Sequence, residues 1–77
     1  MNLQIITPDT ELFSGEVDSV VVPGTDGLIG ILNNHAPLVS SLKAGQVKIS
    51  NSGKEDFFDV KGGVVEVLSN TVIILAT

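Results

Sequence analysis

Residues 46 to 54 read QVKISNSGK, and this stretch decides the fold class. Val47 and Ile49 alternate with polar residues, so in a β-strand both apolar side chains would point to one face. Asn51-Ser52-Gly53-Lys54 follows directly and has the residue types of a tight hairpin turn. The stretch therefore predicts a half-buried strand that turns back on itself.

The same pattern extends to both sides of this hairpin. Phe58 and Val60 are predicted to point inward on the next strand, and Val65 and Val67 share one face of the strand after it. Ser69-Asn70 fits a two-residue hairpin, because Asn tolerates a positive φ. Towards the N-terminus, turn residues cluster at 23–27, and the predicted strands are 2–7, 11–16, 17–22, 28–32 and 37–42.

No segment shows sustained helical periodicity, so the chain is predicted to be all-β. About nine short strands are too many for one flat sheet in so small a chain. Two packed antiparallel sheets solve this problem, because each sheet buries its apolar face against the other. We predict a single β-sandwich domain over residues 1–77.

Composition excludes several classes of function. The formal net charge is −5, with four lysines and no arginine, which argues against binding to nucleic acid. Cysteine is absent, so neither disulfides nor thiolate metal sites can form. The apolar run 72–76 is far shorter than the roughly 20 residues of a membrane-spanning helix, and the N-terminus lacks the pattern of a signal peptide.

His35 is the only histidine, so its role needs a separate argument. A zinc site takes three or four ligands, usually His and Cys, and this chain cannot supply them. As a general base, His35 would need a nucleophile and a carboxylate; Ser40, Ser41 and Asp26 are close in sequence, but no nucleophile-elbow pattern is present. A domain of this size also has little volume for a substrate cleft. We predict no catalytic residue, cofactor or metal site.

Glycine and acidic residues have simple structural explanations. The spacing of Gly24, Gly27 and Gly30 differs from that of phosphate-binding loops, and no helix follows, so a turn with a bulge is predicted instead. Six of the nine acidic residues form two patches at turn edges and outward strand positions, where a solvated face is expected. They are Glu11, Glu16, Asp18, Glu55, Asp56 and Asp59.

Two features remain without an explanation: the polar loop around His35 and the closing strand 72–76, which is apolar on both faces. The strand could lie centrally in the sandwich, with its second face under another part of the chain. It could instead present that face to a partner protein. Few residues remain to cover this second face, so we favour contact with a partner protein.

Several short motifs together resemble the epsilon subunit of the rotary proton-translocating ATP synthase. Their order and spacing fit the N-terminal domain of that family along nearly the whole chain. The motifs are Leu12-Phe13-Ser14-Gly15, Val20-Val21-Val22-Pro23-Gly24, Gly30-Ile31-Leu32, His35-Ala36-Pro37-Leu38, Leu42-Lys43-Ala44-Gly45 and Lys61-Gly62-Gly63-Val64-Val65-Glu66-Val67.

The resemblance implies a flattened sandwich of about ten strands. It also implies a non-catalytic subunit of the central stalk, the rotor, which links the gamma subunit to the membrane ring of c subunits and couples proton flow to ATP synthesis. Such a subunit is peripheral to the cytoplasmic face of the bacterial cell membrane. We expect the isolated domain to be monomeric, with the gamma subunit and the c-ring as its partners.

The family's histidine lies near the interface of stalk and ring, so the resemblance implies that the loop 33–36 docks there. Many relatives have Pro-Gly where this chain has Asn33-Asn34, and some have a glutamate where Leu28 stands, a charge that Asp26 could replace. The alternative is that the imidazole of His35 only hydrogen-bonds its own loop. The expected partner contacts, to the c-ring or gamma subunit, are Asp26, Leu28, Asn34, His35 and Ala36.

Relatives commonly continue into a two-helix hairpin that inhibits ATP hydrolysis and, in some members, binds ATP. This sequence stops at Thr77, so we expect no C-terminal helical hairpin and neither of those activities. The competing hypothesis is a free-standing β-sandwich that binds a small ligand or carbohydrate, for which only Phe13, Phe57 and Phe58 could serve as aromatic anchors. An enzyme that depends on His35 is the third alternative.

Overall fold

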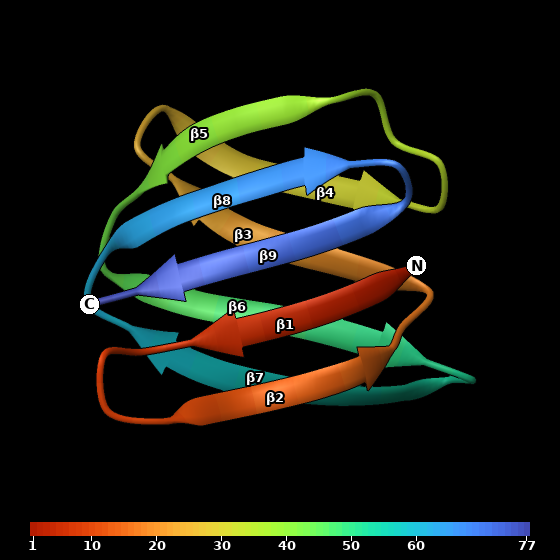
Figure 1. The fold of residues 1–77 in the computed structure, drawn as a ribbon, viewed down its shortest axis with the longest axis horizontal. Helices are drawn as coiled ribbons and strands as arrows, with labels where there is room; N and C mark the ends of the chain where they lie inside the picture. Colours follow the sequence, from red (N-terminus) through yellow and green to blue (C-terminus); the bar gives the residue numbers. More distant parts are fainter.

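The computed structural model describes residues 1–77 and contains nine β-strands and no helix (Figure 1). This confirms the all-β prediction. No helix that could cross a lipid bilayer is present. The strands are β1 (Asn2–Ile6), β2 (Glu11–Glu16), β3 (Ser19–Gly24), β4 (Gly27–Leu32), β5 (Leu38–Leu42), β6 (Gly45–Asn51), β7 (Lys54–Val60), β8 (Gly63–Leu68) and β9 (Thr71–Ala76).

The strands form two layers that pack face to face, as predicted (Figure 1). One layer has the order β2-β1-β9-β8-β5, and the other has the order β7-β6-β3-β4. The layers meet at one corner, where Gly24 of β3 pairs with Leu42 of β5. At the opposite side, β2 and β7 are the edge strands of their layers, each paired with one neighbour only. Phe13 and Phe58 pack edge to face there, with ring centroids 5.9 Å apart.

One strand pairing differs from the predicted antiparallel arrangement. β1 runs parallel to β9, with Leu3 opposite Val72 and Ile5 opposite Ile74. The alternation of apolar residues along a strand defines which face is buried but carries no information about the direction of the neighbouring strand. As a result of this parallel pairing, the first and last strands of the chain lie side by side in the middle of their layer (Figure 1).

The core lies between the two layers and consists of sixteen buried apolar residues. The inward positions predicted for Val47, Ile49 and Val60 are confirmed, and Phe58 packs against the core from the open side. The domain measures 26 × 22 × 18 Å. The buried residues are Met1, Leu3, Ile5, Val17, Val20, Val22, Ile31, Leu42, Val47, Ile49, Val60, Val65, Val67, Val72, Ile74 and Ala76.

Pro23 and Gly24 belong to β3, although the sequence assigned them to a turn. Pro23 pairs with Leu28, and its carbonyl oxygen accepts the Lys43 N–H at 2.9 Å. Gly24 is required there because a Cβ would come within 2.7 Å of the Gly27 carbonyl oxygen. The turn between β3 and β4 is therefore shorter than predicted.

The two predicted hairpin turns are confirmed by their backbone conformations. Both central residues of each turn have positive φ: 52° and 81° at Ser52 and Gly53, and 51° and 57° at Ser69 and Asn70. This combination is typical of the turns whose twist matches that of antiparallel strands. The second of these turns lies beside the His35 loop.

Candidate docking site

The loop between β4 and β5 carries His35, which is partly buried. Its backbone N–H donates to the Leu32 carbonyl oxygen at 3.2 Å, and its Nδ1 lies 2.7 Å from the Ala36 carbonyl oxygen. A carbonyl oxygen can only accept, so Nδ1 is the donor and the neutral ring retains Nε2 as an acceptor. The imidazole thus hydrogen-bonds its own loop and still has one nitrogen for a partner.

Two asparagines attach this loop to the rest of the domain. Asn33 Oδ1 accepts a hydrogen bond from the Met1 α-ammonium group at 2.6 Å. The Asn34 N–H donates to Asn70 Oδ1 at 2.8 Å. Asn34 has a φ of 62°, a conformation that Gly and Asn adopt more readily than other residues. Asn is therefore well suited to this position.

The structure separates the five predicted contact residues into two groups. Asn34, His35 and Ala36 follow the C-terminal end of β4, whereas Asp26 and Leu28 lie at its N-terminal end. A strand of this length spans roughly 20 Å, so the two groups do not form one compact cluster. Both groups lie along β4 at the same edge of the sandwich (Figure 1).

β4 itself connects the two groups through exposed side chains. Leu28 and Leu32 are 75% and 66% exposed, and Gly30 lies between them with nothing within 4 Å of the place where a Cβ would be. Leu32 is not among the contact residues predicted from the sequence, because residues 28–32 are apolar at nearly every position and show no alternation. In the structure Ile31 is fully buried, so the adjacent Leu32 points to the outward side of β4.

A second exposed surface covers the outward side of the layer that contains β9. Leu75 pairs with Ile6 of β1 and with Val64 of β8, and paired residues point to the same side of a sheet. Ile73 of β9 and Val39 of β5 both pair with Glu66 of β8 and therefore point to this same side. Ile73 is partly exposed, and Val39 is exposed. We define the outer apolar face as Ile6, Val39, Val64, Leu68, Ile73 and Leu75.

The sequence left two possibilities for the closing strand: a central place in its layer, or an apolar face open to a partner. The structure shows a central strand with an open face. β9 is central in its layer, between β1 and β8, but no other part of residues 1–77 covers its second face. Leu75 remains 45% exposed and Leu68 64% exposed. The acidic Glu66 pairs with Ile73 and Val39, and none of the four lysines lies on these strands.

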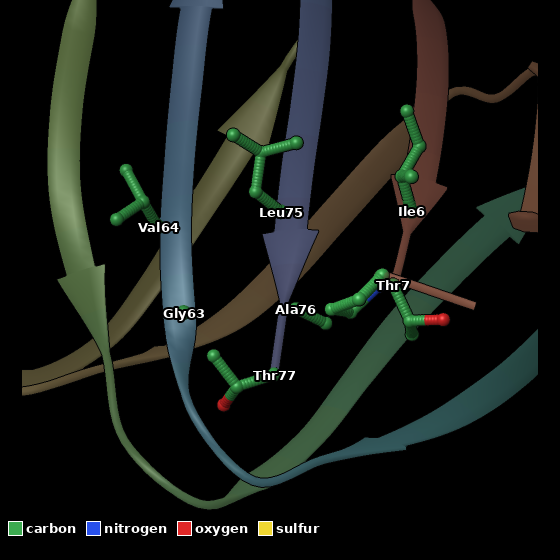
Figure 2. Close-up of a pocket in the computed structure, with 8 residues that line it drawn as sticks. Ile6, Thr7, Gly63, Val64, Leu75, Ala76 and Thr77 are labelled. Atoms are coloured by element: carbon green, nitrogen blue, oxygen red, sulfur yellow. The ribbon is translucent and has the colours of Figure 1, made fainter. Parts of the chain in front are cut away.

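The largest pocket lies at the C-terminal end of β9 and has a volume of about 450 Å³ (Figure 2). Its lining includes Ile6, Val64 and Leu75 but no aromatic or charged residue. A second pocket of about 170 Å³ lies between Phe13 and the acidic end of β7. His35 lines neither pocket.

Several acidic residues contact their own neighbours. Asp18 Oδ2 accepts the Ser52 N–H at 2.8 Å and so joins the start of β3 to the turn between β6 and β7. Glu55 lies 3.5 Å from Lys48 Nζ, and Asp59 accepts a hydrogen bond from Gln46 at 3.1 Å. No group of three or more His, Cys, Asp or Glu side chains is arranged to hold a metal ion.

Comparison with known proteins gives a consistent result. The family model described as "ATP synthase, Delta/Epsilon chain, beta-sandwich domain" matches residues 1–77. The chain is 51% identical over 74 residues to the ATP synthase epsilon chain of Chlorobium limicola, covering 95% of this chain and 84% of that protein. It is 49% identical over 75 residues to that of Leptospira borgpetersenii, covering 97% of this chain and 59% of that protein.

Solved structures show the same fold. A chain in the Euglena gracilis mitochondrial ATP synthase, in a structure of OSCP, F1 and the c-ring, superposes with a TM-score of 0.90 and 25% identity, covering 96% of this chain and 48% of that one. A chain in the central stalk and c-ring of the Tetrahymena thermophila enzyme has a TM-score of 0.85 at 20% identity, covering 99% of this chain and 62% of that one. Because the family model spans the whole of residues 1–77, the chain belongs to the family of ATP synthase delta and epsilon chains and represents its beta-sandwich domain.

Proposed function

We propose that the chain is a non-catalytic part of the central stalk of a rotary ATP synthase. It links the gamma subunit to the c-ring and thereby helps to couple proton flow to ATP synthesis. The observation that carries this proposal is the match of the whole chain to the delta/epsilon sandwich domain, supported by epsilon chains about half identical to it. In this role the domain is held at the cytoplasmic face of the bacterial membrane through its complex.

The outer apolar face is the surface we assign to the gamma subunit. Five of its six residues lie on β1, β8 and β9, which are paired with neighbouring strands on both sides, so these side chains are held in place before a partner binds. It combines exposed Leu75 with the acidic Glu66 and lacks lysine. A partner surface with apolar and basic side chains would complement it.

The c-ring is assigned to the edge formed by β4 and the His35 loop. This edge offers Leu28 and Leu32 for apolar contact and His35 Nε2 for a hydrogen bond. It is distinct from the outer apolar face, because β4 belongs to the other layer. A domain that joins two partners needs two such surfaces, and a close-packed sandwich between them resists deformation.

We expect Leu75→Ser to weaken binding to the cognate gamma subunit about 10- to 100-fold, because burying a leucine side chain contributes roughly 1.5–3 kcal/mol. Size-exclusion chromatography at micromolar concentration measures this as loss of co-elution. Phe57→Ser is the matched control, since Phe57 is 51% exposed but lies on β7, in the other layer. If the unaltered chain did not co-elute with gamma at all, the stalk role would be wrong.

We expect His35→Ala to leave the melting temperature within about 2 °C of the unaltered domain while weakening attachment to the c-ring roughly two- to tenfold, the effect of one lost hydrogen bond. Thermal unfolding and binding to detergent-solubilised c-ring, with gamma present, measure the two effects separately. A fall of several degrees with unchanged ring binding would mean that the imidazole only supports its own loop.

A further inference from the structure

The His35 loop has few contacts of its own that could fix its position. Within the loop, the structure has one backbone hydrogen bond from His35 to Leu32 and the bond from the imidazole to Ala36. Asn33, Asn34 and Ala36 are all exposed, so apolar packing contributes little to their placement. The loop therefore depends on contacts from elsewhere in the chain.

Asn70 supplies one of these contacts. Its Oδ1 accepts the Asn34 N–H at 2.8 Å, across 36 residues of sequence. The side chain of Asn70 comes from the turn between β8 and β9, and its carbonyl oxygen accepts the Asn2 N–H at 3.1 Å. One residue thus joins three separate segments: the start of β1, the β8–β9 turn and the His35 loop.

The position of Asn70 is itself well fixed. Its φ of 57° belongs to a two-residue turn in which both residues are left-handed, and Ser69 precedes it with a φ of 51°. Strands β8 and β9 pair along their full length up to Leu68 and Thr71, directly beside this turn. The side-chain acceptor is therefore presented from a rigid base.

We propose that Asn70 is a positioning residue for the His35 loop, which it holds in the conformation that docks on the c-ring. The inference rests on the proposed docking role of that loop. Asn70 need not touch the ring itself: its amide oxygen fixes the backbone of Asn34, and through it the direction in which His35 Nε2 points. The Met1–Asn33 hydrogen bond holds the preceding residue in the same way.

Two substitutions separate the hydrogen bond from the turn. Asn70→Gly keeps the left-handed backbone, which glycine adopts without cost, but removes the acceptor oxygen. Asn70→Asp keeps an acceptor oxygen at the same place and is also tolerated in this conformation. Both variants should fold like the unaltered chain, because the side chain of Asn70 is exposed.

The direct measurement is amide hydrogen exchange of Asn34 by NMR on the 77-residue chain. We expect exchange to be about two- to tenfold faster in Asn70→Gly, as for the loss of one net hydrogen bond, and unchanged in Asn70→Asp. Binding to c-ring with gamma should weaken by a similar factor in Asn70→Gly and be retained in Asn70→Asp. This pattern, with rescue by aspartate, would support the proposal.

Two results would overturn it. Unchanged exchange of Asn34 in Asn70→Gly would show that the amide oxygen does not hold the loop. Faster exchange without weaker ring binding, in a preparation where His35→Ala does weaken it, would show that the contact does not position the docking group. If His35→Ala also bound the ring normally, the docking role of the loop would fail instead, while the exchange data would still decide whether Asn70 fixes the loop.

Discussion

Gly63→Ala is expected to destabilise the domain by at least about 3 kcal/mol, which can be most of the stability of a domain this small. Gly63 begins β8 with a φ of 133°, a region that residues with a side chain rarely enter and that costs about 1–3 kcal/mol. A Cβ at this position would also collide with the carbonyl oxygen of Leu75 on the paired strand β9. Urea unfolding followed by circular dichroism measures the loss.

Gly53→Ala is the matched control for this substitution. Gly53 also has a positive φ, 81°, but nothing lies within 4 Å of the place where its Cβ would be. Only the backbone penalty of roughly 1–2 kcal/mol should remain. Equal stabilities of the two variants would contradict the collision with Leu75 as the main cause.

Ile74→Ala should cost about 2–5 kcal/mol, because it removes a buried side chain and leaves a cavity. Ile74 is fully buried. It pairs with Ile5 of β1 on one side and with Val65 of β8 on the other, and both are fully buried as well. The urea midpoint should fall while the slope of the transition stays the same. The cavity would open in the core between the two layers, beneath a central strand whose paired neighbours leave it little freedom to move and close the space.

Ile73→Ala tests the opposite face of the same strand. Ile73 points outward and is only partly buried, so its loss should cost less than about 1 kcal/mol in the free domain. The same variant should weaken binding to the gamma subunit, since Ile73 belongs to the outer apolar face. An equal loss of stability in Ile73→Ala and Ile74→Ala would contradict the assignment of the two faces.

The sequence predicts strand faces well where only one face is apolar. Val47 and Ile49 alternate with polar residues, and the structure confirms them as buried. In β4 and β9 the alternation disappears because both faces carry apolar residues, so neither Leu32 nor the exposed side of Leu75 could be identified in advance. The apolar residues on both faces of β9 correctly identified it as an unusual strand. They did not show that it lies centrally in its layer and also leaves one face open.

The remaining differences come from contacts between distant segments. The parallel pairing of β1 with β9 and the hydrogen bond from Asn34 to Asn70 join residues far apart in sequence. Local patterns do not encode such contacts. Pro23 and Gly24 are residue types common in turns, but Pro23 pairs with Leu28 and Gly24 with Gly27, so both belong to β3. The contact residues inferred by resemblance remain a prediction.

The parallel pairing of β1 with β9 has a consequence for biosynthesis. Asn2 pairs with Thr71, so β1, which is synthesised before the other eight strands, cannot find this neighbour until the residues of β9 have been made. Until then β1 has only β2 beside it, and an isolated two-stranded hairpin is marginally stable in water. Pairing between segments so far apart in sequence is typical of slowly folding β-proteins. Until it occurs, Leu3 and Ile5, which are buried in the folded domain, are exposed and prone to aggregate.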